Sequence, residues 1–463
     1  MRSRRFRREQ SRRLVRLLSG AIERLYVVLI MASCTPLTGM QALEVSEGEV
    51  CGPDWMPRGV VKDGQCLFDA LVPSTELCPI PELDNPATAT VTIEPGKYAT
   101  WSAVFALPVD DIFLLTGDYR SMGPVYQSGP RSTQDLTRRT LVHCLAAPCF
   151  VETLELRDGA DRFVLSNLTI DLQTIPSQIR TVNDVVVDRL TLTHASSTYG
   201  LRLLSANNVC VQRSTFGYHF PVPFTDNMAI QVKPITPMSG VKIIDNEIFD
   251  WVDGIAVTAH NLDPMMPVSN VKIEGNDIYL TPTYQECGEN GIDIKAGSDT
   301  ATVSVTRNRL WGFRQGDTKC AGSGSLGDAI LVHVAARNVE IQRNIVFDAP
   351  RAYRDKLRDD GLSRHVEIDW NLFYGLTTDV FDFWTDARMI SNTISASTAV
   401  CEAYEPPFVP GPPTWIGNAL VDTPEPIGLC GWIGGYLISG STDIVFQRKR
   451  WTGIESVVLG NAY

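Results

Sequence analysis

One short pattern recurs along the middle of the 463-residue chain and constrains its fold more than any other feature. It reads apolar, any, apolar, two mostly polar residues, Asn, any, apolar. Apolar residues at every second position indicate strands and not helices. The steps between the repeated Asn residues vary from 21 to 36 residues, which is typical of stacked coils whose insertions fall in loops. Five clear copies and a fainter sixth contain, in chain order, Asn246, Asn276, Asn308, Asn344, Asn371 and Asn392.

The repeated Asn has a physical role at the turn between two short strands. Asn tolerates left-handed backbone angles and forms hydrogen bonds with nearby backbone groups. Stacked at roughly 4.8 Å on the Asn of the next coil, it can build a hydrogen-bonded ladder. We therefore expect one column of Asn side chains, with Val271, Ile273, Ile278 and their equivalents inside the coils.

These repeats resemble the right-handed parallel β-helix of the pectate-lyase-like superfamily, and the resemblance covers most of the chain. It implies an all-β fold, a right-handed parallel β-helix (solenoid) with N-terminal and C-terminal caps. Each coil contacts only its neighbours, so one solenoid can span several hundred residues. The same fold carries lyases, hydrolases, epimerases and non-catalytic binders, so it does not define an activity. The expected regions are an export signal at 1–33, a cysteine-containing N-terminal cap at 34–85, the β-helix at 86–398 and a C-terminal cap or tail at 399–463.

The N-terminal region reads as an export signal. Nine Arg residues precede the apolar run at 25–32, which is too short for an ordinary membrane-spanning helix. The stretch Met31-Ala-Ser-Cys34 resembles a bacterial lipobox, so a lipid anchor at Cys34 is one reading. Ordinary cleavage after Ala42 is another, and a basic cytoplasmic tail is the third. We expect an exported protein of the periplasm, the cell envelope or the medium, with membrane contact only through that anchor.

The charge of the chain bears on its partners. The net charge is −12, and removal of nine of the 41 basic residues and two of the 53 acidic ones with the leader leaves −19. Such a surface argues against nucleic acid as a partner. An acidic polysaccharide would need a local basic strip. We expect a monomer.

The cysteines indicate disulfides. Of eleven cysteines, ten are left once Cys34 is lipidated or removed, and an even number is typical of a disulfide-bonded exported protein. No CxxC pair occurs, which disfavours zinc. The expected local bridges are Cys51–Cys66, Cys144–Cys149 and Cys401–Cys430, and Cys287 and Cys320 can join the loops of neighbouring coils.

A second strand in each repeat presents polar side chains away from the core. Side chains alternate along a strand, so aligned strands of stacked coils form outward columns. We expect one solvent-facing strip on this face, overhung by the insertion at 314–327. The first column contains Arg202, Gln231, Ala256, Asp293 and Leu331. The second contains Leu204, Lys233, Thr258, Lys295 and His333, and the preceding turns supply Asn227, Asp253, Asn290 and Asp328.

The resemblance to polysaccharide lyases of this fold implies a chemistry for the strip. In those enzymes a basic side chain removes the proton at C5 of a uronic acid, and a cation or Ca²⁺ neutralises the sugar carboxylate. Lys295 is the expected base. The candidate catalytic residues are Lys295, His333, Lys233 and Arg337. The candidate Ca²⁺ ligands are Asp253, Glu289, Asp293 and Asp328.

Two functions stay open. The first is a lyase that acts on a uronic-acid-containing polymer by β-elimination. The second is a non-catalytic cell-envelope protein that binds a glycan or another partner, in which case Lys295 is a surface lysine paired with Asp293. The motif sets of polygalacturonases, mannuronan epimerases and the main pectate lyases are absent from the sequence.

Overall fold

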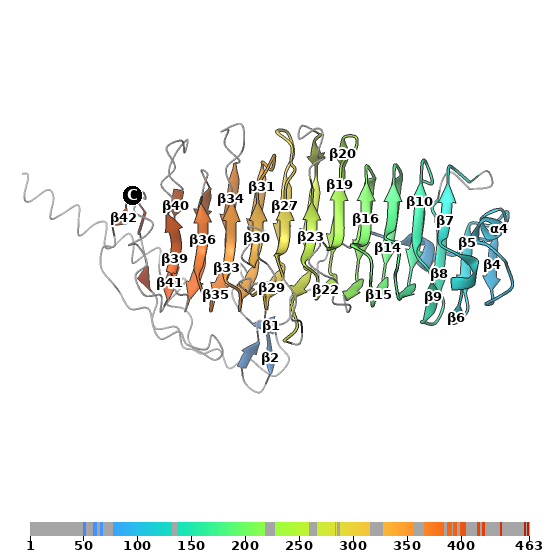
Figure 1. The fold of residues 1–463 in the computed structure, drawn as a ribbon, viewed down its shortest axis with the longest axis horizontal. Helices are drawn as coiled ribbons and strands as arrows, with labels where there is room; N and C mark the ends of the chain where they lie inside the picture. The colour runs from blue at the N-terminus through green and yellow to red at the C-terminus, as the bar shows by residue number, and fades with distance from the viewer. Residues whose placement is uncertain are drawn as a thin grey trace, which may run out of the picture.

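The structure is a computed structural model, and it describes residues 77–131, 138–217, 227–258, 266–282, 284, 288–314, 327–355, 365–383, 387–390 and 392–395. The backbone of a few short strands outside these ranges is also described. Three long sheets run along one axis, and the coils stack from β4 (Thr90–Ile93) at one end to β40 (Thr414–Ile416) near the other (Figure 1).

The chain forms a right-handed parallel β-helix, as the family resemblance implied. Strands of successive coils pair in parallel in all three sheets, apart from one antiparallel strand at the end of the third. Parallel connections take the right-handed form almost without exception. The three sheets are numbered 1 to 3.

Sheet 1 carries the outward columns described above. Its strands are β7 (Val125–Ser128), β10 (Leu154–Arg157), β13 (Ser177–Arg180), β16 (Tyr199–Leu204), β19 (Met228–Lys233), β23 (Asp253–Val257), β27 (Asn290–Ile294), β30 (Asp328–Val332), β33 (Arg351–Asp355), β36 (Asp379–Phe383) and β39 (Ala399–Ala403).

Sheet 2 contains the strand that precedes each repeated Asn. Besides β4 and β40, its strands are β5 (Asp111–Leu114), β8 (Thr140–Cys144), β11 (Phe163–Ser166), β14 (Asn183–Asp188), β17 (Asn207–Gln212), β21 (Lys242–Ile244), β25 (Val271–Glu274), β28 (Val303–Thr306), β31 (Val339–Gln342), β34 (Val366–Asp369) and β37 (Arg388–Ile390).

Sheet 3 contains the strand that follows each Asn. Its strands are β6 (Gly117–Asp118), β9 (Cys149–Val151), β12 (Thr169–Asp171), β15 (Thr191–Thr193), β18 (Thr215–Gly217), β22 (Glu247–Phe249), β26 (Asp277–Tyr279), β29 (Arg309–Trp311), β32 (Ile345–Phe347), β35 (Leu372–Tyr374), β38 (Thr393–Ser395), β41 (Ala419–Val421) and the antiparallel β43 (Val458–Leu459).

The remaining elements are short. They are β1 (Val50–Cys51), β2 (Gly59–Lys62), β3 (Gln65–Leu67), β20 (Met238–Ser239), β24 (Val268–Ser269), β42 (Tyr436–Leu437), β44 (Asn461–Ala462), the α-helices α3 (Pro81–Asp84) and α4 (Trp101–Phe105), and the 3₁₀ turn η1 (Arg120–Met122). In the part of the chain that the structure describes, no helix has the length and apolarity to cross a bilayer.

The Asn ladder is confirmed. Asn308 donates from its side-chain amide to the Ile273 carbonyl and to Asn344 Oδ1, at 3.0 and 2.9 Å, and its own Oδ1 accepts from the backbone and side chain of Asn276. The same bonds link the column from Asn246 to Asn392. The Ser214 amide donates to Asn246 Oδ1 and its hydroxyl accepts from the Leu190 amide, and the ladder ends there because Leu190 has no polar side chain.

The left-handed residue in this turn is not the Asn. It is the residue before it: Arg307 has φ 57° ahead of Asn308, and Arg343 has φ 57° ahead of Asn344. The Asn is therefore required for its side-chain amide, which carries a donor and an acceptor, and not for its tolerance of positive φ. The ladder needs both groups on one buried side chain.

The core consists of the inward side chains of all three sheets. Val271, Ile273 and Ile278 are at most 2% exposed, as predicted. At the N-terminal end, α4 places Trp101, Val104 and Phe105 on this core, where the Phe105 ring meets the Phe163 ring edge-on at 5.6 Å. A short helix thus covers part of the solenoid end, where bare strand edges would otherwise pair with other chains.

The two ends of the β-helix differ from the regions predicted from the sequence. The part of the expected N-terminal cap that the structure describes, from Leu77, lies along the outside of sheet 2 and packs on Leu141, Val164 and Val186. At the other end the parallel sheets continue past residue 398 into β39, β40 and β41, because the Pro-rich stretch falls between β39 and β40 and not within a strand.

Two disulfides are present among the described residues. Cys144–Cys149 was predicted, and Cys78–Cys210, which joins cysteines 132 residues apart, was not. The predicted pairs Cys51–Cys66, Cys401–Cys430 and Cys287–Cys320 fall on side chains outside the described part of the chain.

Candidate functional site

The outward columns of sheet 1 have the predicted register. Arg202 pairs with Gln231, Gln231 with Ala256, Ala256 with Asp293, and Asp293 with Leu331. In the second column the Lys295 amide donates to the Val257 carbonyl at 2.7 Å, and the His333 amide to the Ile294 carbonyl at 2.9 Å. Coil stacking therefore brings together side chains that lie 40 residues apart.

Asp293 is the centre of the site. One carboxylate oxygen lies 2.9 Å from His333 Nε2, and the other lies 2.7 Å from Lys295 Nζ. Burial by itself would raise the pKa of Asp293, but His333 and Lys295 outweigh it and hold that pKa below its usual value. Asp293 is therefore an ionised carboxylate that orients two basic side chains.

The site is only partly open to solvent. The side chains of Lys295 and His333 are 23% and 17% exposed, whereas Asp293 is 1% exposed. The expectation of a fully solvent-facing strip is therefore wrong for Asp293, because its own basic partners cover it.

Asp253 lies beside this centre on β23. Its Oδ1 accepts from the Asn290 side chain at 2.9 Å, while its Oδ2 is buried without a hydrogen-bond partner. Burial raises the pKa of Asp253 well above its usual range, and the charges of Asp293 and Glu289 raise it further. The neutral acid is thus the favoured form of Asp253.

Asp328 belongs to a different charge network. Its Oδ1 lies 3.0 Å from Arg351 Nη1, and its Oδ2 lies 3.7 Å from Arg354 Nη1. Arg354 also forms a 2.9 Å ion pair with Asp382 on β36. The sequence analysis missed this network. Its signal was present, because Arg351 and Arg354 on the next coil pair in register with Asp328 and Leu331.

Towards the N-terminal end, sheet 1 presents three basic side chains on successive coils: Arg180, Arg202 and Lys233. Within the described part of the chain none of them has an acidic partner. Arg202 stacks over the Tyr199 ring at 4.5 Å and donates to Gln231 at 2.9 Å. Burial lowers the pKa of Lys233, and the charge of Arg202 lowers it further.

Two predicted site residues lie away from this centre. Arg337, in the turn after β30, forms a 2.7 Å ion pair with Asp299. Glu289 precedes β27, and its negative charge raises the pKa of Asp253. Most of the insertion that was expected to overhang the strip, residues 315–326, lies outside the described residues. Of its two ends, Arg314 lies 3.2 Å from Asp348 and Gly327 has φ 79°.

Three of the four predicted Ca²⁺ ligands do not offer a free carboxylate. Both oxygens of Asp293 are already engaged by His333 and Lys295, Asp328 faces two arginines, and Asp253 favours its neutral form. Ca²⁺ takes several free oxygen ligands in one place. Over the residues that the structure describes, no three His, Cys, Asp or Glu side chains come together to hold a metal ion.

Comparison with known proteins yields structural neighbours only. No protein-family model matches the sequence, and no curated protein matches it. Two solved structures of PfbA, a surface adhesin of Streptococcus pneumoniae, align with 13% and 12% identity and TM-scores of 0.38 and 0.37; they cover 74% and 72% of this chain and 88% and 97% of theirs. An alginate lyase from Paenibacillus sp. str. FPU-7 aligns with 16% identity and a TM-score of 0.28, covering 73% of this chain and 95% of its own. At such low scores these likenesses carry no argument about function, and the assignment of the chain as a right-handed parallel β-helix rests on its own sheet topology.

Proposed function

We propose that this β-helix is an exported polysaccharide lyase that cleaves a uronic-acid-containing polymer by β-elimination along sheet 1. The observation that carries the proposal is the pairing of His333 and Lys295 on one buried carboxylate, Asp293. A carboxylate-oriented imidazole beside a fixed ammonium group is the pair that proton abstraction next to a carboxylate requires. The disulfides support export.

The geometry favours different roles from those in the sequence analysis. Lys295 is held as an ammonium ion by Asp293, so it suits neutralisation of the sugar carboxylate better than removal of a proton. His333 uses Nε2 towards Asp293, which leaves Nδ1 to act as the base. In this reaction His333 takes the C5 proton, the electrons of that C–H bond form the C4–C5 double bond, and the bond from C4 to its oxygen breaks. The imidazolium then returns the proton to the departing oxygen.

The three basic side chains Arg180, Arg202 and Lys233 supply binding for the polymer. They lie on β13, β16 and β19, at roughly 4.8 Å per coil. Arg180 and Lys233 share one outward column with Leu204 between them, and Arg202 stands in the neighbouring column. Beyond the pair, the Arg351–Asp328 network is already neutralised. The polymer therefore binds mainly on the N-terminal side of His333.

The experiment is turnover of a panel of uronic-acid polymers, followed by the absorbance of the unsaturated product. His333→Ala should reduce turnover by about 10²–10⁴-fold. Lys233→Ala should raise KM with little change in kcat, because it removes binding that substrate and transition state share. Arg388→Ala on sheet 2, whose partner is Glu367, is the matched control. Normal turnover by His333→Ala would contradict its role as the base.

The second candidate is a non-catalytic glycan-binding protein of the cell envelope. The observation in its favour is that both oxygens of Asp293 are engaged, which is also how a purely structural ion pair is built. Binding of a uronic-acid polymer without formation of a double bond, across the whole panel, would favour this function over the lyase.

A further inference from the structure

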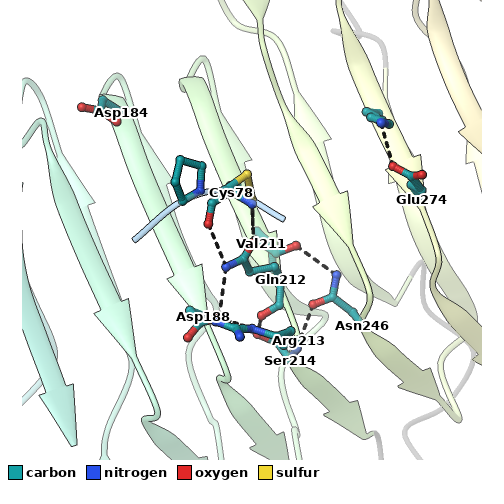
Figure 2. Close-up of a disulfide and its surroundings, with 12 residues drawn as sticks. Cys78, Asp184, Asp188, Val211, Gln212, Arg213, Ser214, Asn246 and Glu274 are labelled. Carbon is teal, nitrogen blue, oxygen red and sulfur yellow. Dashed lines mark hydrogen bonds and ion pairs between the residues drawn. A yellow bond between two sulfur atoms is a disulfide. The ribbon is translucent and has the colours of Figure 1, made fainter. Parts of the chain in front are cut away.

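Residues 77–84 form a strap that crosses the outside of sheet 2. At one end Cys78 is joined by a disulfide to Cys210 on β17. At the other end Glu82 pairs with Arg139, next to β8, with Nη2 2.9 Å from Oε2. The strap therefore runs back along the solenoid over four coils, and Figure 2 shows its Cys78 end lying across the strands.

The strap covers an apolar ledge. Leu141, Val164 and Val186 occupy one outward column of sheet 2, where polar residues are the rule on a solvated face. Ile80 packs on this column and is itself 9% exposed. Without the strap, these outward side chains would face water, so the strap and the ledge stabilise each other.

The two ends of the strap are held by different chemistry. At the first end the Cys78 amide donates to Gln212 Oε1 at 2.8 Å, and Gln212 Nε2 donates to the Cys78 carbonyl at 3.3 Å (Figure 2). Gln212 is in turn held by the buried carboxylate of Asp188 at 3.2 Å. The Glu82 end has only an ion pair and hydrogen bonds to Arg139. Only the first end thus contains a bond that a reductant can break.

The two disulfides differ in their access to solvent. Cys78 is partly exposed and Cys210 is 4% exposed, whereas Cys144 and Cys149 are each 0% exposed. A thiolate must reach a sulfur atom to exchange with a disulfide. An external dithiol therefore meets Cys78 first.

We propose that the Cys78–Cys210 disulfide is a redox-sensitive latch that holds the first half of the strap on sheet 2. A dithiol reductant attacks the Cys78 sulfur as its thiolate, and Cys210 leaves as a thiolate that takes up a proton. The second thiol of the reductant then displaces Cys78 and closes the reductant's own disulfide. Two electrons and two protons pass to the protein, and the strap lifts from Gln212 while Glu82 stays on Arg139.

The test is hydrogen exchange and cysteine alkylation of the full-length protein under graded dithiothreitol. We expect alkylation at Cys78 and Cys210 at concentrations that leave Cys144 and Cys149 unmodified. Peptides that span residues 77–84 should then exchange at least about tenfold faster, while peptides of β11 and β12 stay protected.

Two variants serve as controls. Cys78→Ser with Cys210→Ser should reproduce the fast exchange without reductant. Gln212→Leu keeps the disulfide, so its strap should stay slower than that of the double variant. Unchanged exchange of the strap on reduction, or alkylation of Cys144 at the same dithiothreitol concentration as Cys78, would overturn the proposal. Loss of protection throughout the solenoid would do the same, because the bond would then be a staple of the whole fold.

Discussion

At the scale of single residues, the side chains that matter most are polar ones inside the coils. Asn308 is fully buried and takes part in hydrogen bonds with both neighbouring coils. A buried polar group is costly to leave unpaired, so a ladder of identical amides works only where each member has a partner on both sides. Each Asn thus stabilises a turn and also fixes the register between coils.

Replacement of Asn308 by Ala should lower the free energy of unfolding by about 2–4 kcal/mol, because it removes the buried hydrogen bonds of the Ile273 carbonyl and of both Asn276 amides, and one of the two bonds to Asn344 Oδ1. Denaturant unfolding measures this change. Ser304→Ala on the same coil is the control: Ser304 is partly exposed on β28 and should change stability by less than about 0.5 kcal/mol. Equal losses for the two variants would argue against the ladder as a source of stability.

Asp369 offers a pH-dependent test at the same scale. Burial raises its pKa to about 6, and the neighbouring charges of Glu367 and Glu340 add to the effect in spite of Arg388. Because the folded state binds the proton more tightly than the unfolded state, stability falls as the pH rises from about 4 to about 6.

Asp369→Asn should therefore be more stable than the parent protein at pH 7, by roughly 1 kcal/mol after allowance for solvent screening. Near pH 4 the two proteins should have the same stability. Thermal unfolding across this pH range measures the difference, and a gap that does not vary with pH would contradict the assigned cause.

At the scale of elements, sheet 3 carries an outward stack of five aromatic rings on successive coils. Trp311 lies between Tyr279 at 4.3 Å and Phe347 at 5.5 Å, with interplanar angles of 8° and 6°. Phe249 and Tyr374 extend the stack at its two ends. Both faces of Trp311 are covered, so this ring stabilises the stacking of coils and does not offer a platform for a sugar ring.

Trp311→Ala should cost about 2–4 kcal/mol of stability, since it removes two stacked contacts worth roughly 0.5–1.5 kcal/mol each and part of the covered apolar area. Trp311→Phe keeps an aromatic ring in the stack and should lose less than about 1.5 kcal/mol. Thermal unfolding of both variants checks the difference. A Phe variant as unstable as the Ala variant would show that ring stacking is not the cause.

At the scale of the whole molecule, charge is distributed unevenly. The chain carries a net charge of −12, yet Arg180, Arg202 and Lys233 lie on one face of sheet 1, on three successive coils and in two neighbouring columns. Repulsion between the acidic surface as a whole and an acidic polymer acts over a Debye length, about 8–10 Å in physiological salt. At short range the attraction between these three basic side chains and the polymer must exceed that repulsion. Added salt screens both the attraction and the repulsion.

Arg180→Ala should weaken binding of a uronic-acid polymer by about fivefold, or roughly 1 kcal/mol. Arg388→Ala, on β37 of sheet 2, should leave binding unchanged. Titration at two salt concentrations provides the measurement. If the two variants bind alike, the polymer does not lie on sheet 1.

The coil and its register could be predicted from the amino-acid sequence. The repeated Asn and the alternating apolar residues are local patterns, and a parallel stack converts them directly into columns, so the ladder and the approach of Lys295 to His333 followed from alignment alone. The burial of the site's side chains and their pairing could not be predicted in this way, because both depend on contacts between side chains of different coils. Whether Asp293 is ionised, and which basic side chains cover it, depends on side chains from two coils meeting in a partly buried place. The same holds for Cys78–Cys210, because a strap that runs back over the solenoid brings together cysteines 132 residues apart and no repeat in the sequence marks their meeting.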